Sequence, residues 1–125
     1  MQLLRIATLA VVAIGLKAQT PAPSPVTHVM AILTVKDGVD RTEMTKVMPR
    51  EVRDTVQLHL DGRIDQWYAR GDGRGVVFIL NAKTVEEAKS FMEALPLIQG
   101  KFASFDYMTL GPLSPLRILL APPAR

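Results

Sequence analysis

The residues best suited to chemistry in this 125-residue chain are one carboxylate and a pair of neighbouring aromatic side chains. Glu51 lies one position before Val52 in a helical repeat of apolar residues, so we expect its carboxylate near the edge of the buried face. Partial burial would raise the pKa of this carboxyl and suit it to proton transfer. The alternative is that Glu51 only complements the positive N-terminal end of its own helix.

The aromatic pair is Trp67 and Tyr68, which are adjacent on a predicted strand. Adjacent strand residues point to opposite faces, so one ring should line the gap between helix and sheet and the other should face a partner. An aromatic wall and a phenol are typical of a pocket for a small apolar molecule, with plain core packing as the alternative. Tyr107 on a later strand and His59 on the polar flank of the helix are further candidate binding residues, although His59 near a helix C-terminus also has an electrostatic explanation.

The composition excludes several kinds of site. The chain has no cysteine, which removes disulfides, cysteine nucleophiles and cysteine-ligated metals. Its only histidines are His28 and His59, so we expect no metal site. Gly71, Gly73 and Gly75 alternate ahead of a strand rather than a helix, so we interpret them as hairpin residues with unusual backbone dihedrals and not as a phosphate-binding loop.

The N-terminal segment, residues 1–18, has the pattern of an export signal. Arg5 precedes an apolar run over residues 6–16, which is typical of a signal peptide. We expect cleavage after Ala18 and an exported protein that is not attached to a membrane, with an uncleaved anchor as the alternative. Residues 19–125 then hold 13 Lys and Arg against 12 Asp and Glu, a net charge of +1. This small positive charge argues against a nucleic-acid partner.

The remaining chain is predicted to hold a proline-rich tether, one folded domain and an apolar C-terminal tail, over residues 19–27, 28–115 and 116–125. Strands are expected over residues 28–36, 64–70, 76–80 and 102–110.

Two helices are expected between these strands. In the first, over residues 42–61, Pro49 predicts a short turn followed by a main helix from Pro49 to Leu60. The second opens with a capping box of Thr84 and Glu87 and ends at Pro96.

This βαββαβ order predicts an α+β, ferredoxin-like sandwich in which both helices cover one face of a four-stranded antiparallel sheet. Strands that are wetted on one face alternate between apolar and polar residues, and residues 30–33 and 76–80 do not. We therefore expect a second copy of the chain to cover the other face. A monomer whose tail folds back over its own sheet is the alternative.

Two short stretches carry a family resemblance: Ala94-Leu95-Pro96-Leu97 at the end of the second helix and Gly111-Pro112-Leu113 after the last strand. With the order of elements over residues 28–115, they make the chain resemble the muconolactone isomerase family and, more broadly, YCII-related and other dimeric α/β-barrel proteins. The resemblance implies a dimer that packs through its sheets. It also implies cofactor-free chemistry, in which a proton moves and the double bond of an unsaturated lactone shifts.

In this resemblance, Glu51 falls where the family has a helix carboxylate, which implies a role as base. Tyr68 falls where the family has a strand aromatic, which implies a role as pocket wall or donor. The expected function is an isomerase acting on a small unsaturated lactone or carboxylated compound, with Trp67, His59 and Tyr107 contacting the substrate. The alternatives are a non-catalytic, small-molecule-binding or stress-associated module and a heme-handling protein. A polar cavity enclosing Glu51 would favour the enzyme, and an apolar cavity with Glu51 in solvent would favour the binding module.

Overall fold

The computed structural model describes residues 24–113, 116–120 and 122. The predicted signal segment and most of the predicted tether lie outside these residues. The chain forms, in order, β1 (His28–Val35), α1 (Arg41–Leu60), β2 (Ile64–Ala69), β3 (Gly75–Leu80), α2 (Val85–Met92), α3 (Pro96–Gln99), β4 (Ala103–Leu110) and α4 (Leu116–Leu119).

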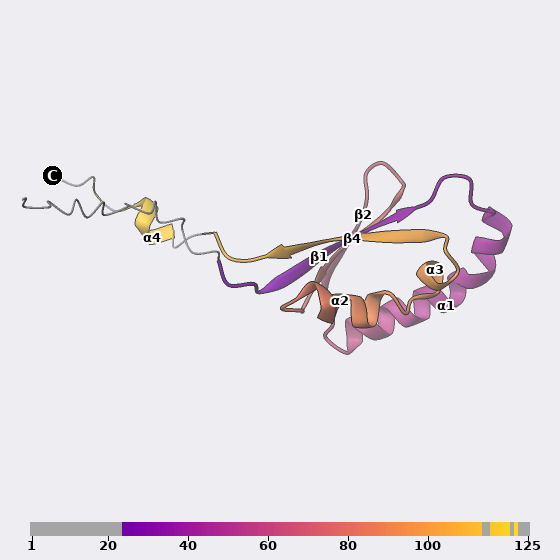
Figure 1. Cartoon of the computed structure of the whole chain (residues 1–125), viewed down its shortest axis with the longest axis horizontal. Coiled ribbons are helices and arrows are strands. Elements are labelled where there is room, and N and C mark those ends of the chain that lie inside the picture. Colours follow the sequence, from indigo (N-terminus) through magenta and orange to yellow (C-terminus); the bar gives the residue numbers. More distant parts are fainter. Residues whose placement is uncertain (1–23, 114–115, 121, 123–125) are drawn as a thin grey trace, which may run out of the picture.

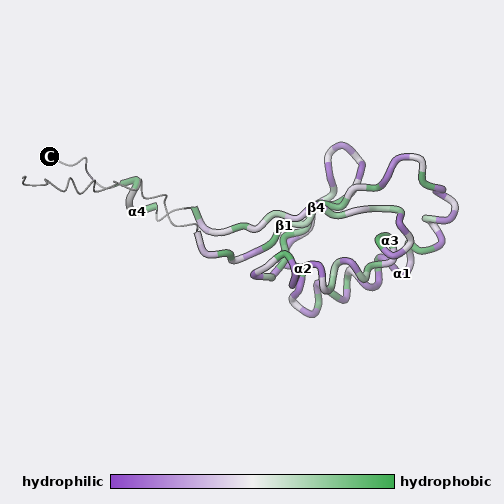
Figure 2. Tube along the Cα trace, viewed as in Figure 1, coloured by the Kyte–Doolittle hydropathy of each residue, from purple (hydrophilic) through white to green (hydrophobic). Residues whose placement is uncertain are grey.

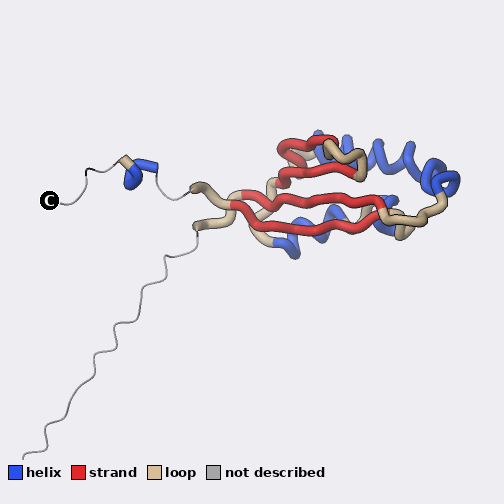
Figure 3. Tube along the Cα trace, turned by 90° about the horizontal axis from the view of Figure 1, so that it is seen from above, coloured by secondary structure: helices blue, strands red, loops and turns tan. Residues whose placement is uncertain are grey.

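The four strands form one sheet in the order β2-β3-β1-β4, and all neighbouring strands are antiparallel. Helices α1, α2 and α3 lie on the same side of this sheet (Figure 1). Seen from above, α1 lies beside the β2–β3 hairpin and α2 beside β1 and β4 (Figure 3). This α+β architecture is compatible with the ferredoxin-like arrangement that the element order predicts.

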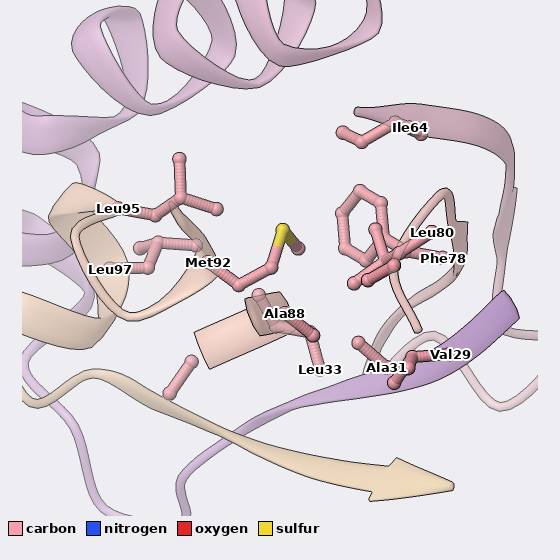
Figure 4. Close-up of a cluster of buried hydrophobic side chains, with 12 residues drawn as sticks. Val29, Ala31, Leu33, Ile64, Phe78, Leu80, Ala88, Met92, Leu95 and Leu97 are labelled. Carbon is pink, nitrogen blue, oxygen red and sulfur yellow. The ribbon is translucent and has the colours of Figure 1, made fainter. Parts of the chain in front are cut away.

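The hydrophobic core fills the space between the sheet and the helices. Alternate residues of the central strands point into it, and Met92 extends from α2 toward the ring of Phe78 (Figure 4). Apolar residues dominate β1, whereas the loops are mostly polar (Figure 2). The fully buried strand residues are Val29, Ala31, Leu33, Ile64, Phe78, Leu80 and Ala103.

Helix α1 is continuous across Pro49, so the prediction of a break before this proline was wrong. Asp40 caps the helix, because its carboxylate accepts hydrogen bonds from the backbone N–H groups of Thr42 and Glu43 at 2.9 and 3.2 Å. Pro49 has no N–H, so the carbonyl of Thr45, four residues earlier, loses its helical hydrogen bond. Both residues lie on the exposed side of the helix. Solvent can satisfy that carbonyl, so the proline is tolerated in the helix interior.

The predicted apolar stripe of α1 is only partly buried. Met44 and Met48 pack against the core, but Val52 and Val56 are exposed and Leu60 is 72% exposed. A spacing of four residues advances about 40° beyond one full turn at each step, so the repeat rotates away from the sheet along the helix. The buried face of the second half of α1 carries polar residues instead.

The second predicted helix is shorter than expected, and an additional helical turn follows it. Thr84 caps α2 as expected, accepting a hydrogen bond from the backbone N–H of Glu87 at 3.1 Å, but the helix ends at Met92 rather than at Pro96. Pro96 instead occupies the first turn of α3, where its missing N–H costs no helical bond. This extra turn lies against α1 and forms part of the wall of a pocket.

The glycines of the β2–β3 hairpin differ from one another. Gly73 has a φ of +72°, in the left-handed region that the prediction anticipated. Gly71 does not, so the prediction was wrong at this position. Gly75 is required for a different reason, because a Cβ atom there would overlap the backbone oxygen of Leu33 on the neighbouring strand β1.

The outer face of the sheet has no helix over it within the described ranges (Figure 1). In the described part of the tail, Leu116, Leu119 and Leu120 are all strongly exposed and do not cover this face. The alternative of a tail folded back over its own sheet therefore finds no support in the part of the tail that is described. Among the described helices, none combines the length and apolar character that a membrane span requires.

Candidate functional site

A pocket of about 370 Å³ lies between the middle of α1 and the β2–β3 half of the sheet. Its walls come from α1, from all three strands on that side and from the first turn of α3. A volume of this size lies within the range of small-molecule sites. The lining residues are Leu33, Met48, Glu51, Val52, Thr55, Val56, Trp67, Tyr68, Ala69, Val76, Phe78 and Leu97.

Glu51 is the only residue of this lining with a carboxyl group, and it is only 5% exposed. Its Oε2 accepts a hydrogen bond from the backbone N–H of Leu97 at 2.9 Å. Within the described residues its Oε1 has no hydrogen-bond partner, and no fully buried side-chain oxygen there is unpaired. Oε1 is therefore accessible from the pocket, while Oε2 anchors the carboxyl to α3.

The surroundings of Glu51 raise its pKa above the ordinary value of 4.5. The main cause is burial, which penalises the charged carboxylate, and the negative charge of Asp54 acts in the same direction. The hydrogen bond from Leu97 opposes both effects, because it stabilises the charged form. A carboxyl of this kind exchanges a proton closer to neutral pH than an exposed glutamate does.

The position of Glu51 excludes one interpretation of its role. Helix α1 begins at Arg41, so Glu51 lies in the middle of the helix and not in its first turn. Stabilisation of its own helix N-terminus falls off within one turn and cannot explain this residue.

The raised pKa has a consequence for stability. A carboxyl that titrates higher in the folded than in the unfolded state binds more protons when folded, so its contribution to stability is lost as pH rises through the folded-state pKa. Glu51→Gln keeps the oxygen that accepts from Leu97 and removes the buried charge. We expect this variant to be more stable than the wild type at neutral pH, with the difference disappearing below the ordinary glutamate range near pH 4.5.

Urea unfolding at a series of pH values measures this effect. Glu43→Gln is the matched control, since Glu43 lies on the same helix but is exposed and paired with Lys46 at 2.6 Å. A Glu51→Gln variant that is equally stable or less stable than the wild type at neutral pH would contradict the expectation.

Trp67 forms the aromatic wall of the pocket on the helix side of the sheet. It lies opposite Phe78 in the strand register, and the two rings meet edge to face with centroids 6.2 Å apart. His59 stacks on the indole at 5.3 Å, and its Nδ1 lies 3.0 Å from the backbone oxygen of Ile64. A carbonyl only accepts, so Nδ1 carries the proton. His59 packs against Trp67 without lining the pocket itself.

Tyr68 lies at the rim, on the edge strand β2, and is 57% exposed. Its hydroxyl donates a hydrogen bond to Oε1 of Gln66 at 2.7 Å. Thr55 also contributes a hydroxyl to the lining, but it donates to the backbone oxygen of Glu51 at 2.7 Å. Both hydroxyls are therefore already engaged as donors.

The structure does not bring Tyr107 to this pocket. Its hydroxyl donates to Oε1 of Glu93 at 3.0 Å, and Lys89 lies 5.7 Å from the centre of its ring. Burial, followed by the hydrogen bond to Glu93 and its negative charge, strongly raises the pKa of this phenol. Tyr107 thus joins β4 to the end of α2, away from the β2 edge.

Sequence reasoning missed the backbone N–H of Leu97 and the lining role of Thr55. The signal for the first was Pro96, since proline is common in the first turn of a helix. The signal for the second was Thr55 itself, four residues after Glu51 and therefore on the same face of α1. Leu97 lies where the predicted helix boundary was wrong, and Thr55 lies where the predicted buried face of α1 was wrong.

No cluster of three or more metal-ligating side chains occurs in the part of the chain that the structure describes. His28 lies at the start of β1, with its Nε2 atom 3.7 Å from Asp65, and His59 is engaged with Trp67 and Ile64.

Comparison with known proteins yields no assignment. Models of protein families give no match to the chain, and a search of curated proteins gives none either. A functional proposal for this chain therefore depends on the geometry of the pocket.

Proposed function

We propose that the chain binds a small unsaturated ring compound, such as a lactone, in the pocket beside α1 and isomerises it by proton transfer through Glu51. The observation that carries the proposal is the Glu51 carboxyl, which is buried, anchored through one oxygen and open to an apolar pocket through the other. A base of this type must be held rigidly beside an acidic C–H group, and the Leu97 hydrogen bond supplies that restraint.

In this reaction Oε1 of Glu51 removes a proton from carbon next to the carbonyl group of the ligand. Oε1 then returns a proton at a different carbon, so that the double bond shifts and the carboxylate is regenerated. The raised pKa of Glu51 assists the first half, because it makes the carboxylate a stronger base. The apolar walls exclude water from the intermediate.

A second candidate is a binding module without catalysis. An apolar lining was expected for this module and an enclosed Glu51 for the enzyme, and the pocket has both features. The module is also favoured because the hydroxyls of Thr55 and Tyr68 already donate to Glu51 and Gln66. Stabilisation of an enolate oxygen requires a free donor, so Tyr68 would have to release Gln66 and turn inward. In the binding module, Glu51 would simply accept a hydrogen bond from the ligand.

Proton exchange separates the two candidates. The purified protein is incubated with unsaturated lactones in deuterated water, and loss of the ring C–H signals is followed by NMR. The isomerase requires exchange that depends on the protein. The binding module requires chemical-shift changes of the lactone without exchange.

We also propose that a second copy of the chain covers the outer face of the sheet. Two cross-strand pairs of apolar residues, Met30 with Ile79 and Ile32 with Val77, occupy the centre of that face. A two-fold axis brings the same patch of both subunits together, so an apolar patch of this kind can be covered by its own copy. Tyr68 lies on the same face at the pocket rim, and the second copy would therefore border the site.

Analytical ultracentrifugation is expected to give the mass of a dimer for the wild type and of a monomer for Ile32→Glu, because two buried carboxylates would face each other across the axis. Thr42→Glu, on the exposed first turn of α1, adds the same charge on the opposite side of the molecule and should leave the dimer intact. Circular dichroism checks that Ile32→Glu remains folded. A wild-type monomer at micromolar concentration would remove this part of the proposal.

We also propose that the chain is exported, and this proposal depends on the signal-peptide pattern of residues 1–18 alone. Fractionation of cells that express the full chain, with mass spectrometry of the N-terminus, tests both the location and cleavage after Ala18.

A further inference from the structure

The charge of the pocket determines which ligands it can accept. Glu51 provides the only carboxyl group among the lining residues, and no lysine, arginine or histidine is among them. Arg50 on the same helix is 80% exposed and lies 3.5 Å from Asp54, so it is directed toward solvent. A negatively charged ligand would therefore meet a carboxyl group and no compensating cation.

The guanidinium of Arg70, which follows the pocket strand β2, is engaged elsewhere. Its Nη1 donates to Oγ1 of Thr34 at 2.6 Å. Its Nη2 lies 2.5 Å from Oδ2 of Asp72 in the hairpin. These bonds hold Arg70 on the outer side of the sheet, where it cannot neutralise an anion beside Glu51.

The remaining walls are aromatic and aliphatic, which suits an apolar ring. The indole of Trp67 and the ring of Phe78 meet at an interplanar angle of 66°, and aliphatic side chains from α1 face them. Oε1 of Glu51 is the one carboxylate oxygen of this described lining without a protein partner. A ligand that directs a donor to this oxygen gains a charge-assisted hydrogen bond.

We infer that the pocket selects a neutral, planar ring compound with a hydroxyl or polarised C–H donor and rejects compounds of the same size that carry a carboxylate. The inference rests on the proposed function in placing the ligand beside Glu51, but it does not require catalysis. It narrows the ligand class, since a carboxylated substrate no longer fits the site.

Three para-substituted ethylbenzenes test this selection at neutral pH: para-ethylphenol, para-ethyltoluene and para-ethylbenzoate. Calorimetry gives the affinities, and the indole N–H resonance of Trp67, the single tryptophan of the chain, reports occupancy of the pocket. We expect the phenol to bind about tenfold to a hundredfold more tightly than the benzoate, because like charges in a desolvated site repel strongly. The toluene should bind between them, since it lacks both the donor and the charge.

Two variants test whether the charge of Glu51 causes the preference for the phenol over the benzoate. Glu51→Gln removes the negative group and should reduce the preference over the benzoate to a few-fold. Val56→Lys places an ammonium group at the partly exposed rim and should favour the benzoate, whereas the neutral control Val56→Met should not.

Benzoate affinity equal to or greater than that of the phenol in the wild type would overturn the inference, as would the absence of any Trp67 response to all three probes. A wild type that prefers the phenol but exchanges no lactone proton would support the inference and remove the isomerase proposal.

Discussion

Replacing Glu51 with glutamine is expected to lower the rate of lactone proton exchange by about a hundredfold to ten-thousandfold, the usual contribution of a general base. Glutamine has nearly the same shape and can still accept the hydrogen bond from Leu97, which is 2.9 Å long in the wild type. The substitution therefore removes basicity and leaves the position of the side chain in place. Exchange rates measured by NMR in deuterated water, at saturating lactone, give the ratio directly.

The control for this variant is Glu43→Gln, which changes the same chemical group on an exposed part of α1 and should leave the exchange rate unchanged. The wild-type rate should rise with pH as Glu51 loses its proton, and the midpoint should lie above the ordinary glutamate value of 4.5 because burial raises this pKa. A Glu51→Gln variant that retains the wild-type rate would mean that another group is the base.

Replacing Gly75 with alanine is expected to destabilise the domain by about 3 kcal/mol, at the upper end of what overpacking usually costs. A Cβ atom at this position would overlap the backbone oxygen of Leu33 and lie 2.8 Å from its carbonyl carbon. Backbone atoms of a strand that is paired on both sides cannot move aside as a flexible side chain can. Strand β3 would have to separate from β1 at the point where Gly75 is in register with Thr34.

Gly71→Ala is the matched control within the same hairpin. No atom lies within 4 Å of a Cβ built there, and its φ is outside the left-handed region, so alanine should be neutral or stabilise by up to about 1 kcal/mol. Urea unfolding of the two variants measures the difference. Equal stability of the two would show that the β1–β3 contact adjusts at little cost.

The Gly75 variant also connects stability with the site. Strand β3 carries Val76 and Phe78, and its hairpin partner β2 carries Trp67, so a displaced β3 would open one wall of the pocket. Ligand affinity should therefore fall in Gly75→Ala even at temperatures where the variant remains folded.

Local signals in the sequence were sufficient for much of this architecture. Local residue patterns and turn signals predicted all four strands to within one residue at each end, and Thr84 with Glu87 predicted the start of α2. These signals depend on neighbours within a few positions, where backbone preference and side-chain capping act directly. The element order then limited the topology to few arrangements.

The wrong predictions concern α1, where solvent exposure and not the local sequence decides the outcome. Pro49 predicted a helix break, but its place on the solvent side of α1 makes the lost hydrogen bond tolerable. The four-residue repeat predicted a buried stripe through Leu60, but the orientation of α1 on the sheet turns that end of the stripe outward.

From the sequence alone, Glu51 was a carboxylate near the edge of an apolar helix face, and Trp67 and Tyr68 were aromatic residues on one strand. Only the tertiary structure decided that Leu97, 46 residues away along the chain, donates its backbone N–H to that carboxylate and leaves the second oxygen open to the pocket. The physical reason is that burial and long-range hydrogen bonds depend on how α1 and α3 pack against each other, and no local pattern specifies that contact.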